Sequence, residues 1–266
     1  MDIFILKLVL TPLLIGGASL AVRRWGQGVG GWLVGLPLTS GPVAFFLALE
    51  HGTGYAASAA LGSLSGVMAE ASFCLGYGWA ATRAGWPLAF LAGSVTFAAA
   101  TILLQMLTLG LLDAFLGAIM CLVVILRLMP SGRESVILAP PPRWDIPGRM
   151  IVATALIFGL TSAATALGPR LSGILATFPI FAGTLAVFAH HLQGPRAAFS
   201  VLRGLLLGLF SFAGFFPVLA ILIERGGIAL AFVAASLVSL LIQGVTLWVV
   251  RREAGRGAAI GRDEIA

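Results

Sequence analysis

One acidic residue, Glu70, lies inside a long apolar stretch and could carry a proton across a membrane. It is the only Asp, Glu, Lys or Arg between positions 55 and 82. An ionisable side chain at mid-membrane costs about 2.5–3.5 kcal/mol on insertion scales and indicates a functional residue by default. Loss of hydration disfavours the charged carboxylate, which would suit proton coupling. The alternative is a neutral Glu70 that is hydrogen-bonded to Ser or Thr on a neighbouring helix.

Two motifs that combine Pro, Gly and hydroxyl residues could form a binding site. "GLPLTSGP" occupies 35–42 and "TFPIFAGT" occupies 177–184, each in the middle of an apolar run. A proline inside a helix removes one backbone hydrogen bond. In lipid the freed carbonyl groups need a hydroxyl, a water molecule or a ligand. Either the two breaks line a substrate site, or they are simple kinks satisfied by Ser and Thr. The candidate substrate-binding residues here are Pro37, Thr39, Ser40, Gly41, Pro179, Gly183 and Thr184.

Two further charged residues complete the set of candidate substrate-binding residues. Asp113 lies about two turns into a predicted helix and could pair with Lys7 or Arg170, or line an outer vestibule. Arg203 lies at a similar depth from the other face. Snorkelling of its side chain to the interface is the favoured explanation, with an anion-binding role left open.

The composition excludes a soluble domain. Of 266 residues, 59% are apolar and 10% are charged, and the mean hydropathy is +1.06. Soluble domains carry about 25% charged residues. The net charge of +6 comes almost entirely from arginines between apolar runs. That pattern reflects membrane topology and indicates no nucleic-acid partner.

The chain contains an internal repeat with an offset of 142 residues. "GVGGWLVGLPLTSGPVAFF" at 28–46 aligns without a gap with "RLSGILATFPIFAGTLAVF" at 170–188, and "LAFLAGS" at 88–94 aligns with "LAFVAAS" at 230–236. Glycines and prolines in register over this length indicate a duplicated unit. The aligned pairs include Gly31 with Gly173, Pro37 with Pro179, Gly41 with Gly183, and Phe46 with Phe188.

Nine transmembrane helices follow from the apolar runs. We expect them at about 3–22, 29–50, 55–82, 86–106, 107–129, 149–167, 170–192, 197–223 and 228–250. This makes an all-α polytopic membrane protein in a 4+1+4 arrangement. It comprises a first four-helix repeat (1–106), a linking helix (107–129), a cytoplasmic linker (130–148), a second repeat (149–250) and a disordered cytoplasmic tail (251–266).

The odd number of helices predicts that the second repeat is inverted. With the N-terminus outside and the C-terminus cytoplasmic, all but three of the 16 basic residues lie inside, as the positive-inside rule requires. The linking helix makes the second repeat enter from the opposite face. The result is a pseudo-two-fold axis in the membrane plane, an arrangement found in many secondary transporters.

Small residues recur every fourth position in the third helix of each repeat and predict close helix packing. Such stripes let two backbones approach each other, as in Gly-x-x-x-Gly contacts. We expect a seam where the two repeats meet. The stripes are Ser58, Gly62 and Gly66, and Ser200, Gly204 and Gly208.

The second half resembles the small GlpM-type bacterial inner-membrane proteins. The resemblance is carried by "ILATFPIFAGTLAVFAHHLQGPRAAFSVLRGLLLG" and "LAFVAAS", and more weakly by the first half. Those proteins are single four-helix units, so the resemblance implies a fused two-copy version in a bacterial inner membrane. It implies little about the substrate.

The leading hypothesis is a small secondary transporter, which could be proton-coupled, for a small metabolite or ion. The alternative is a flippase for lipid or lipid-linked precursors, or an accessory subunit of an envelope pathway. No catalytic, metal-ligand or cofactor motif stands out, so we expect no enzyme activity, no metal and no cofactor. The expected partners are membrane lipid and the substrate, and a homodimer is left open.

Overall fold

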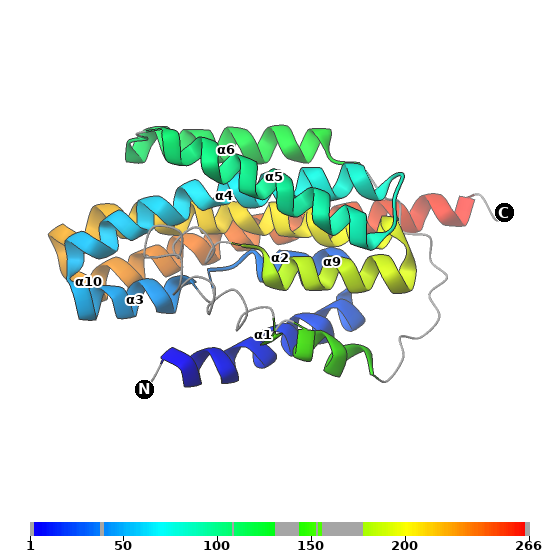
Figure 1. Cartoon of the computed structure of the whole chain (residues 1–266), viewed down its shortest axis with the longest axis horizontal. Helices are drawn as coiled ribbons and strands as arrows, with labels where there is room; N and C mark the ends of the chain where they lie inside the picture. The colour runs from blue at the N-terminus through cyan, green and yellow to red at the C-terminus, as the bar shows by residue number, and fades with distance from the viewer. Residues whose placement is uncertain are drawn as a thin grey trace.

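The computed structural model describes residues 3–37, 40–107, 109–130, 144–152, 154–155 and 178–263, where every regular element is a helix (Figure 1). The helices are α1 (Ile3–Trp25), α2 (Gln27–Val34), α3 (Ser40–His51), α4 (Thr53–Ala81), α5 (Trp86–Met106), α6 (Leu111–Leu128), α9 (Ile180–Gln193) and α10 (Pro195–Asp263). A further short helix, at 145–152 and 154–155, lies beside α1.

Within the described ranges, four helices are long and apolar enough to cross a membrane. They are α4, α5, α6 and the Pro195–Trp248 part of α10. Their outward faces carry large apolar side chains, such as Met106 at 78% exposed and Leu241 at 72%. Water would not favour such a surface, whereas hydrocarbon would. The prediction of a multi-pass helical membrane protein is therefore confirmed at this level, while nine spans and their inversion stay predictions.

The first part of α10 is the central helix of the bundle. Its side chains from Ala198 to Leu219 are mostly buried, and it packs against both α4 and α2. The chain then turns at Gly227, whose φ of +78° suits glycine. From there the second part runs back along the bundle (Figure 1).

Glycine brings α2 and α10 into backbone contact. A Cβ on Gly35 would lie 2.6 Å from the Cα of Gly208, and a Cβ on Gly31 or Gly204 would collide with the backbone of the opposite helix. Gly31 and Gly35 thus face Gly204 and Gly208, with a four-residue spacing on both helices. The predicted seam is found here for the α10 stripe. In the α4 stripe, by contrast, Ser58 and Gly62 are exposed.

Helix boundaries repeat at the 142-residue offset. Helix α3 ends at His51 and α4 begins at Thr53, while α9 ends at Gln193 and α10 begins at Pro195. The residue between each pair is a glycine of positive φ, Gly52 at +87° and Gly194 at +89°. In Figure 1, α3 runs from the middle of the bundle to one end and α9 runs from the middle to the other.

Three predicted boundaries need correction. The run 29–50 forms two separate helices, because the chain leaves the helical path between Val34 and Ser40. The segment 145–148, which was assigned to the linker, is already helical. The tail was predicted to be disordered, but α10 continues to Asp263, and its sequence contains no proline to end the helix. The first part of the predicted span 170–192 lies outside the described residues.

Candidate functional site

The two proline motifs form equivalent helix starts. The carbonyl oxygen of Pro37 accepts a hydrogen bond from the Gly41 backbone N–H at 2.9 Å, and that of Pro179 accepts one from Gly183 at 2.7 Å. Each proline therefore starts the helix that follows it, α3 or α9. The N–H groups of a first helical turn lack carbonyl partners inside the helix and are available to other acceptors. At Pro37 the described chain is interrupted between α2 and α3, whereas at Pro179 the structure describes the start of α9 and the residues before Phe178 lie outside the described part.

Each break packs against an aromatic pair from the other half of the chain. A Cβ on Gly183 would lie 3.2 Å from the Phe90 ring and 3.6 Å from the Phe73 ring, and one on Gly41 would lie 3.7 Å from the Phe215 ring. Phe73 and Phe90 meet edge to face at 5.8 Å between ring centroids, and Phe215 and Phe232 do so at 6.1 Å. Phe178 and Phe97 extend the first cluster.

The hydroxyl residues at the breaks differ in environment. Thr184 is 2% exposed, and its Oγ1 has no hydrogen-bond partner in the described part of the chain. Ser40 is half-buried as the first residue of α3. Thr39 lies outside the described residues. A buried hydroxyl without a partner often indicates an ordered water or a ligand, so the Pro179 break is the better defined half of the candidate site.

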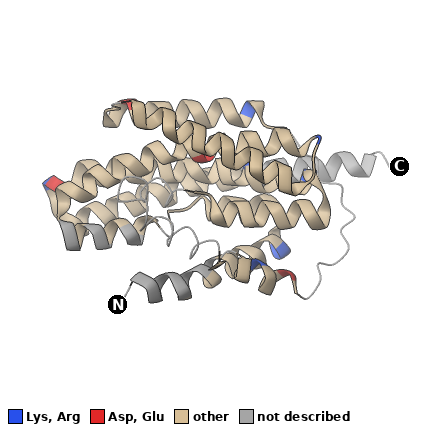
Figure 2. Ribbon diagram, viewed as in Figure 1, with Lys and Arg blue, Asp and Glu red and all other residues tan. Residues whose placement is uncertain are grey.

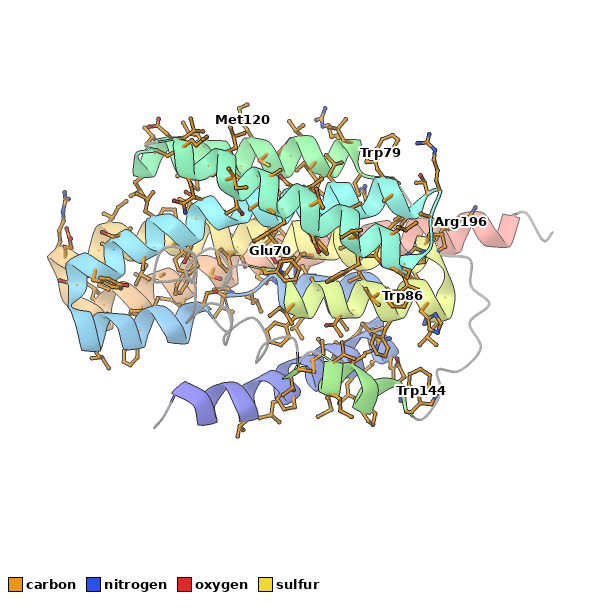
Figure 3. The ribbon with its side chains drawn as sticks, in the orientation of Figure 1. Glu70, Trp79, Trp86, Met120, Trp144 and Arg196 are labelled. Atoms are coloured by element: carbon orange, nitrogen blue, oxygen red, sulfur yellow. The ribbon has the colours of Figure 1, made fainter. Side chains whose placement is uncertain are left out.

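Glu70 lies in the middle of α4 and of the bundle (Figure 3). Figure 2 shows that most of the other coloured charged residues lie nearer the ends of the bundle. Glu70 is half-buried, and no hydrogen bond or ion pair joins it to another described residue. Cys74, one turn further along α4, is fully buried beside it. The equivalent position in the second repeat is Phe212, so the carboxyl group breaks the symmetry of the two halves.

A buried contact between Tyr77 and His190 joins α4 to the end of α9. The Tyr77 hydroxyl and His190 Nδ1 are hydrogen-bonded at 3.2 Å, and the two side chains are almost fully enclosed. Tyr77 lies two turns beyond Glu70 on α4. Nothing in the sequence pairs the two residues, because they lie 113 positions apart.

Asp113 and Arg203 act on helix ends instead of joining the breaks. Asp113 is exposed, and its Oδ2 accepts a hydrogen bond from the Gly110 N–H at 3.3 Å, which caps the start of α6. The Arg203 Nη1 donates to the carbonyl of Leu126 in the last turn of α6 at 3.1 Å. A cation at a helix C-terminus is stabilised by the helix dipole. Both charged side chains thus have a structural role at a helix end.

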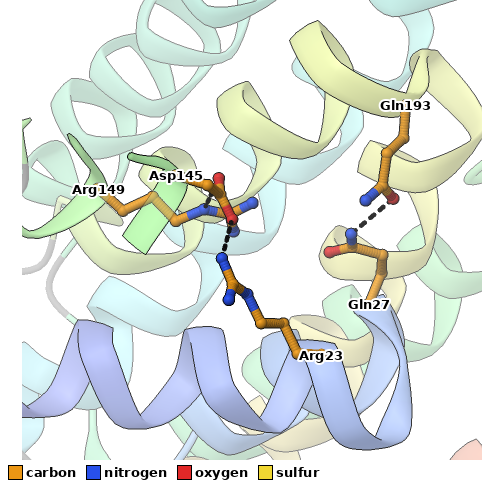
Figure 4. A network of polar contacts seen from close by, with 5 residues as sticks. All are labelled: Arg23, Gln27, Asp145, Arg149 and Gln193. Atoms are coloured by element: carbon orange, nitrogen blue, oxygen red, sulfur yellow. Dashed lines mark hydrogen bonds and ion pairs between the residues drawn. The ribbon is translucent and has the colours of Figure 1, made fainter. Parts of the chain in front are cut away.

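A polar cluster at one end of the bundle was missed in the sequence (Figure 4). Asp145 accepts a hydrogen bond from Arg149 Nε at 2.8 Å, and its other oxygen lies 3.7 Å from Arg23 Nη2 at the end of α1. Nearby, Gln27 Nε2 donates to Gln193 Oε1 at 2.7 Å. The spacing of Asp145 and Arg149 is typical of a surface helical ion pair, so only the fold reveals that it is buried.

No metal centre is formed by the residues that the structure describes, because no group of three or more His, Cys, Asp or Glu side chains comes together there. Comparisons with protein-family models, with curated proteins and with solved structures give no match for this chain. The resemblance to the GlpM-type proteins therefore rests on the quoted motifs alone.

Proposed function

We propose that this protein is a small secondary transporter in which two inverted four-helix repeats rock against each other around the two proline breaks. The observation that carries the proposal is the pair of equivalent helix starts after Pro37 and Pro179, each near the middle of the bundle. Broken helices at corresponding positions of inverted repeats are the usual substrate-binding elements of secondary transporters.

Helix directions support the inverted arrangement. Helices α3 and α9 diverge from the middle of the bundle to opposite ends, and α4 runs against the first part of α10 (Figure 1). Equivalent helices thus point in opposite directions, as a two-fold axis perpendicular to them requires. The nine-span 4+1+4 organisation extends this relationship to the whole chain.

Reciprocal contacts support the same axis. Gly41 of the first repeat faces Phe215 of the second, and Gly183 of the second faces Phe73 of the first. Phe73 and Phe215 are 142 residues apart, as are the two glycines. Two copies of one unit that are related by a two-fold axis make reciprocal contacts of this kind.

The charge distribution supports an orientation with the C-terminus in the cytoplasm of a bacterial cell. Lys and Arg gather mainly at one end of the bundle (Figure 2). Trp79, Trp86 and Trp144 lie towards the same end as Arg196 (Figure 3). Basic residues favour the cytoplasmic side and tryptophan favours the interface. In this orientation the fused GlpM-type unit sits in the inner membrane with its N-terminus outside.

Glu70 is the proposed proton-linked group. It is the one charged side chain of α4, it lies at the level of the breaks, and the second repeat has Phe212 in its place. A symmetric scaffold with one asymmetric carboxyl group can couple a proton to the movement of one solute. The Thr184 hydroxyl, which has no partner among the described residues, provides a polar contact for that solute or for water.

Transport by purified protein in proteoliposomes tests the proposal. A panel of small metabolites and ions is offered with an imposed pH gradient, and uptake is followed for the wild type, for Glu70→Gln and for Glu224→Gln. Glu224 is an exposed carboxylate near the Gly227 turn and serves as the control. We expect gradient-driven uptake of at least one solute by the wild type and Glu224→Gln, with coupling lost in Glu70→Gln.

Two results would contradict parts of this proposal. Normal, gradient-driven uptake by Glu70→Gln would remove the coupling role from Glu70. Movement of a fluorescent phospholipid between leaflets, without movement of any solute in the panel, would replace transport of a solute by the flippase alternative.

A further inference from the structure

Arg149 is a buried cation with an unused hydrogen-bond donor. The residue is 1% exposed, and its Nε donates to Asp145 at 2.8 Å. The Phe188 ring covers the guanidinium group, with its centroid 5.2 Å from the central carbon. The Nη1 atom is also buried and has no hydrogen-bond partner in the part of the chain that the structure describes. A buried donor of this kind usually belongs to a site that water or an ion fills.

Among the residues that the structure describes, the charges around Arg149 do not balance. The guanidinium groups of Arg149 and Arg23 approach Asp145 from two different helices (Figure 4). One carboxylate therefore serves two permanent cations, because arginine keeps its proton under all ordinary conditions. The cluster has an excess positive charge at a place where one of its cations has lost nearly all contact with water. An additional anion would satisfy both the charge and the free donor.

The geometry of guanidinium favours an oxyanion as that ligand. Its N–H groups form a planar fork that matches two oxygens of a phosphate or carboxylate. Trp25 and Trp144, at 56% and 55% exposed, flank the cluster on its two helices, as side chains at the level of lipid headgroups do. Basic pockets between helices on the cytoplasmic side of membrane proteins typically hold phosphate-containing headgroups. Phosphate is therefore the favoured chemistry.

We propose that Arg149 and Arg23 form a binding site for a phosphate oxyanion at the arginine-rich end of the bundle. The site lies between the end of α1 and the start of the helix at 145–155. Nη1 of Arg149 is the buried donor, and the half-exposed Arg23 closes the site on the side of the solvent. This site is separate from the proline breaks and does not depend on the proposed transport.

Binding of two probes to the purified full-length protein tests the site. Inorganic phosphate is titrated by calorimetry, and dioleoylphosphatidylglycerol is added to the protein in detergent and counted by native mass spectrometry. Dioleoylglycerol, which has the same chains without the phosphate, is the control ligand. The variants are Arg149→Gln, Arg149→Lys and Arg23→Gln. The matched control is Arg24→Gln, which removes a neighbouring charge that lies on Trp25.

We expect saturable binding of at least one phosphate probe by the wild type and Arg24→Gln, with affinity reduced tenfold or more in Arg149→Gln and Arg23→Gln. Arg149→Lys should also bind more weakly, because lysine lacks the fork. Binding of phosphatidylglycerol alone would identify a lipid headgroup, and binding of inorganic phosphate would identify a soluble phosphate compound. Either result supports the site.

The proposal is overturned if neither probe binds saturably, if dioleoylglycerol binds as well as phosphatidylglycerol, or if Arg23→Gln binds like Arg24→Gln. Arg23 is half-exposed, so Arg23→Gln should fold even if Arg149→Gln does not. Its affinity for the phosphate probes then decides the test. The measurement detects binding only, so a failure of the transport experiment leaves it unaffected.

Discussion

The ring of Phe73 lies 3.6 Å from the position that a Cβ on Gly183 would occupy, and Gly41 has the same relationship to Phe215 at 3.7 Å. Both contacts join one half of the chain to the other, and both lie where a helix restarts after a proline. The absence of a side chain at the glycine lets the aromatic ring approach the first turn of the helix. Each half of the chain thus supplies the aromatic ring that packs against the first turn of the helix in the other half.

Enlarging Gly183 should disturb this contact in proportion to the size of the new side chain. Gly183→Leu would place atoms where the Phe73 and Phe90 rings lie, and overpacking of this kind costs about 1–3 kcal/mol. Gly183→Ala requires a shift of only a few tenths of an ångström and gains about 1 kcal/mol in helix propensity, so its net effect should be small. Thermal unfolding in detergent measures both. A Leu variant as stable as the wild type would show that the rings do not pack on α9.

Gly204 and Gly62 occupy equivalent positions in the two repeats but should respond oppositely to alanine. A Cβ on Gly204 would collide with the carbonyl oxygen of Gly28, which is backbone and cannot turn away, whereas one on Gly62 would have no described atom within 4 Å. We expect Gly204→Ala to separate α2 from α10 and to cost more than about 3 kcal/mol, the upper end of ordinary overpacking. Gly62→Ala should gain up to about 1 kcal/mol from helix propensity.

The yield of monodisperse protein and the unfolding temperature of the two variants check this contrast. If Gly204→Ala and Gly62→Ala changed the unfolding temperature equally, close backbone contact at Gly204 but not at Gly62 would be contradicted.

Local signals in the sequence predicted the helices and their breaks well. Pro37 separates α2 from α3 and Pro179 precedes α9, since proline lacks a backbone donor, and α5 begins at Trp86 and ends at Met106 as expected. The 142-residue offset also relates positions that the structure treats alike, such as Gly52 and Gly194. These features depend on the chain's own backbone and need no distant partner.

Contacts between distant segments could not be predicted. Arg203 donates to Leu126 and Tyr77 meets His190, but nothing in the sequence pairs these positions. The glycine stripes of α4 and α10 are identical in spacing, yet Gly204 and Gly208 face the backbone of residues 28–35, whereas Gly62 has no described atom within 4 Å. Burial of Asp145 and Arg149 is likewise a property of the fold, because their spacing is the same in an exposed ion pair.

Removing the carboxylate of Asp145 should destabilise the protein far more than removing the charge of Arg23. In Asp145→Asn the buried Arg149 loses its compensating charge, and breaking one partner of a buried pair costs about 3–5 kcal/mol. The Arg23 side chain is 38% exposed and lies 3.7 Å from Asp145, so Arg23→Gln should cost about 0–1 kcal/mol, as for surface pairs. Chemical unfolding followed by tryptophan fluorescence gives both values, and similar costs would show that Arg149 is hydrated.

The contact between Tyr77 and His190 should be measurable as a coupling energy. Tyr77→Phe removes the hydroxyl and leaves Nδ1 of His190 without its partner, which costs about 0.5–1.5 kcal/mol. A double-mutant cycle with His190→Gln isolates the pairwise part. The exposed neighbour His191, changed to Gln, is the control and should show no coupling to Tyr77. A coupling energy near zero for His190 as well would mean that α4 and α9 are not joined here.

The orientation of the chain in the membrane can be checked by labelling single cysteines in a background without Cys74 and Cys121. Ser131→Cys lies in the linker that the positive-inside rule places in the cytoplasm. Gly110→Cys lies before α6 at an exposed position, on the opposite side of the membrane if α6 crosses it once. In intact cells, a membrane-impermeant maleimide should label the cysteine at 110 and reach the one at 131 only after the cells are opened. Labelling of position 131 in intact cells would reverse the proposed topology and place the phosphate site on the outer face.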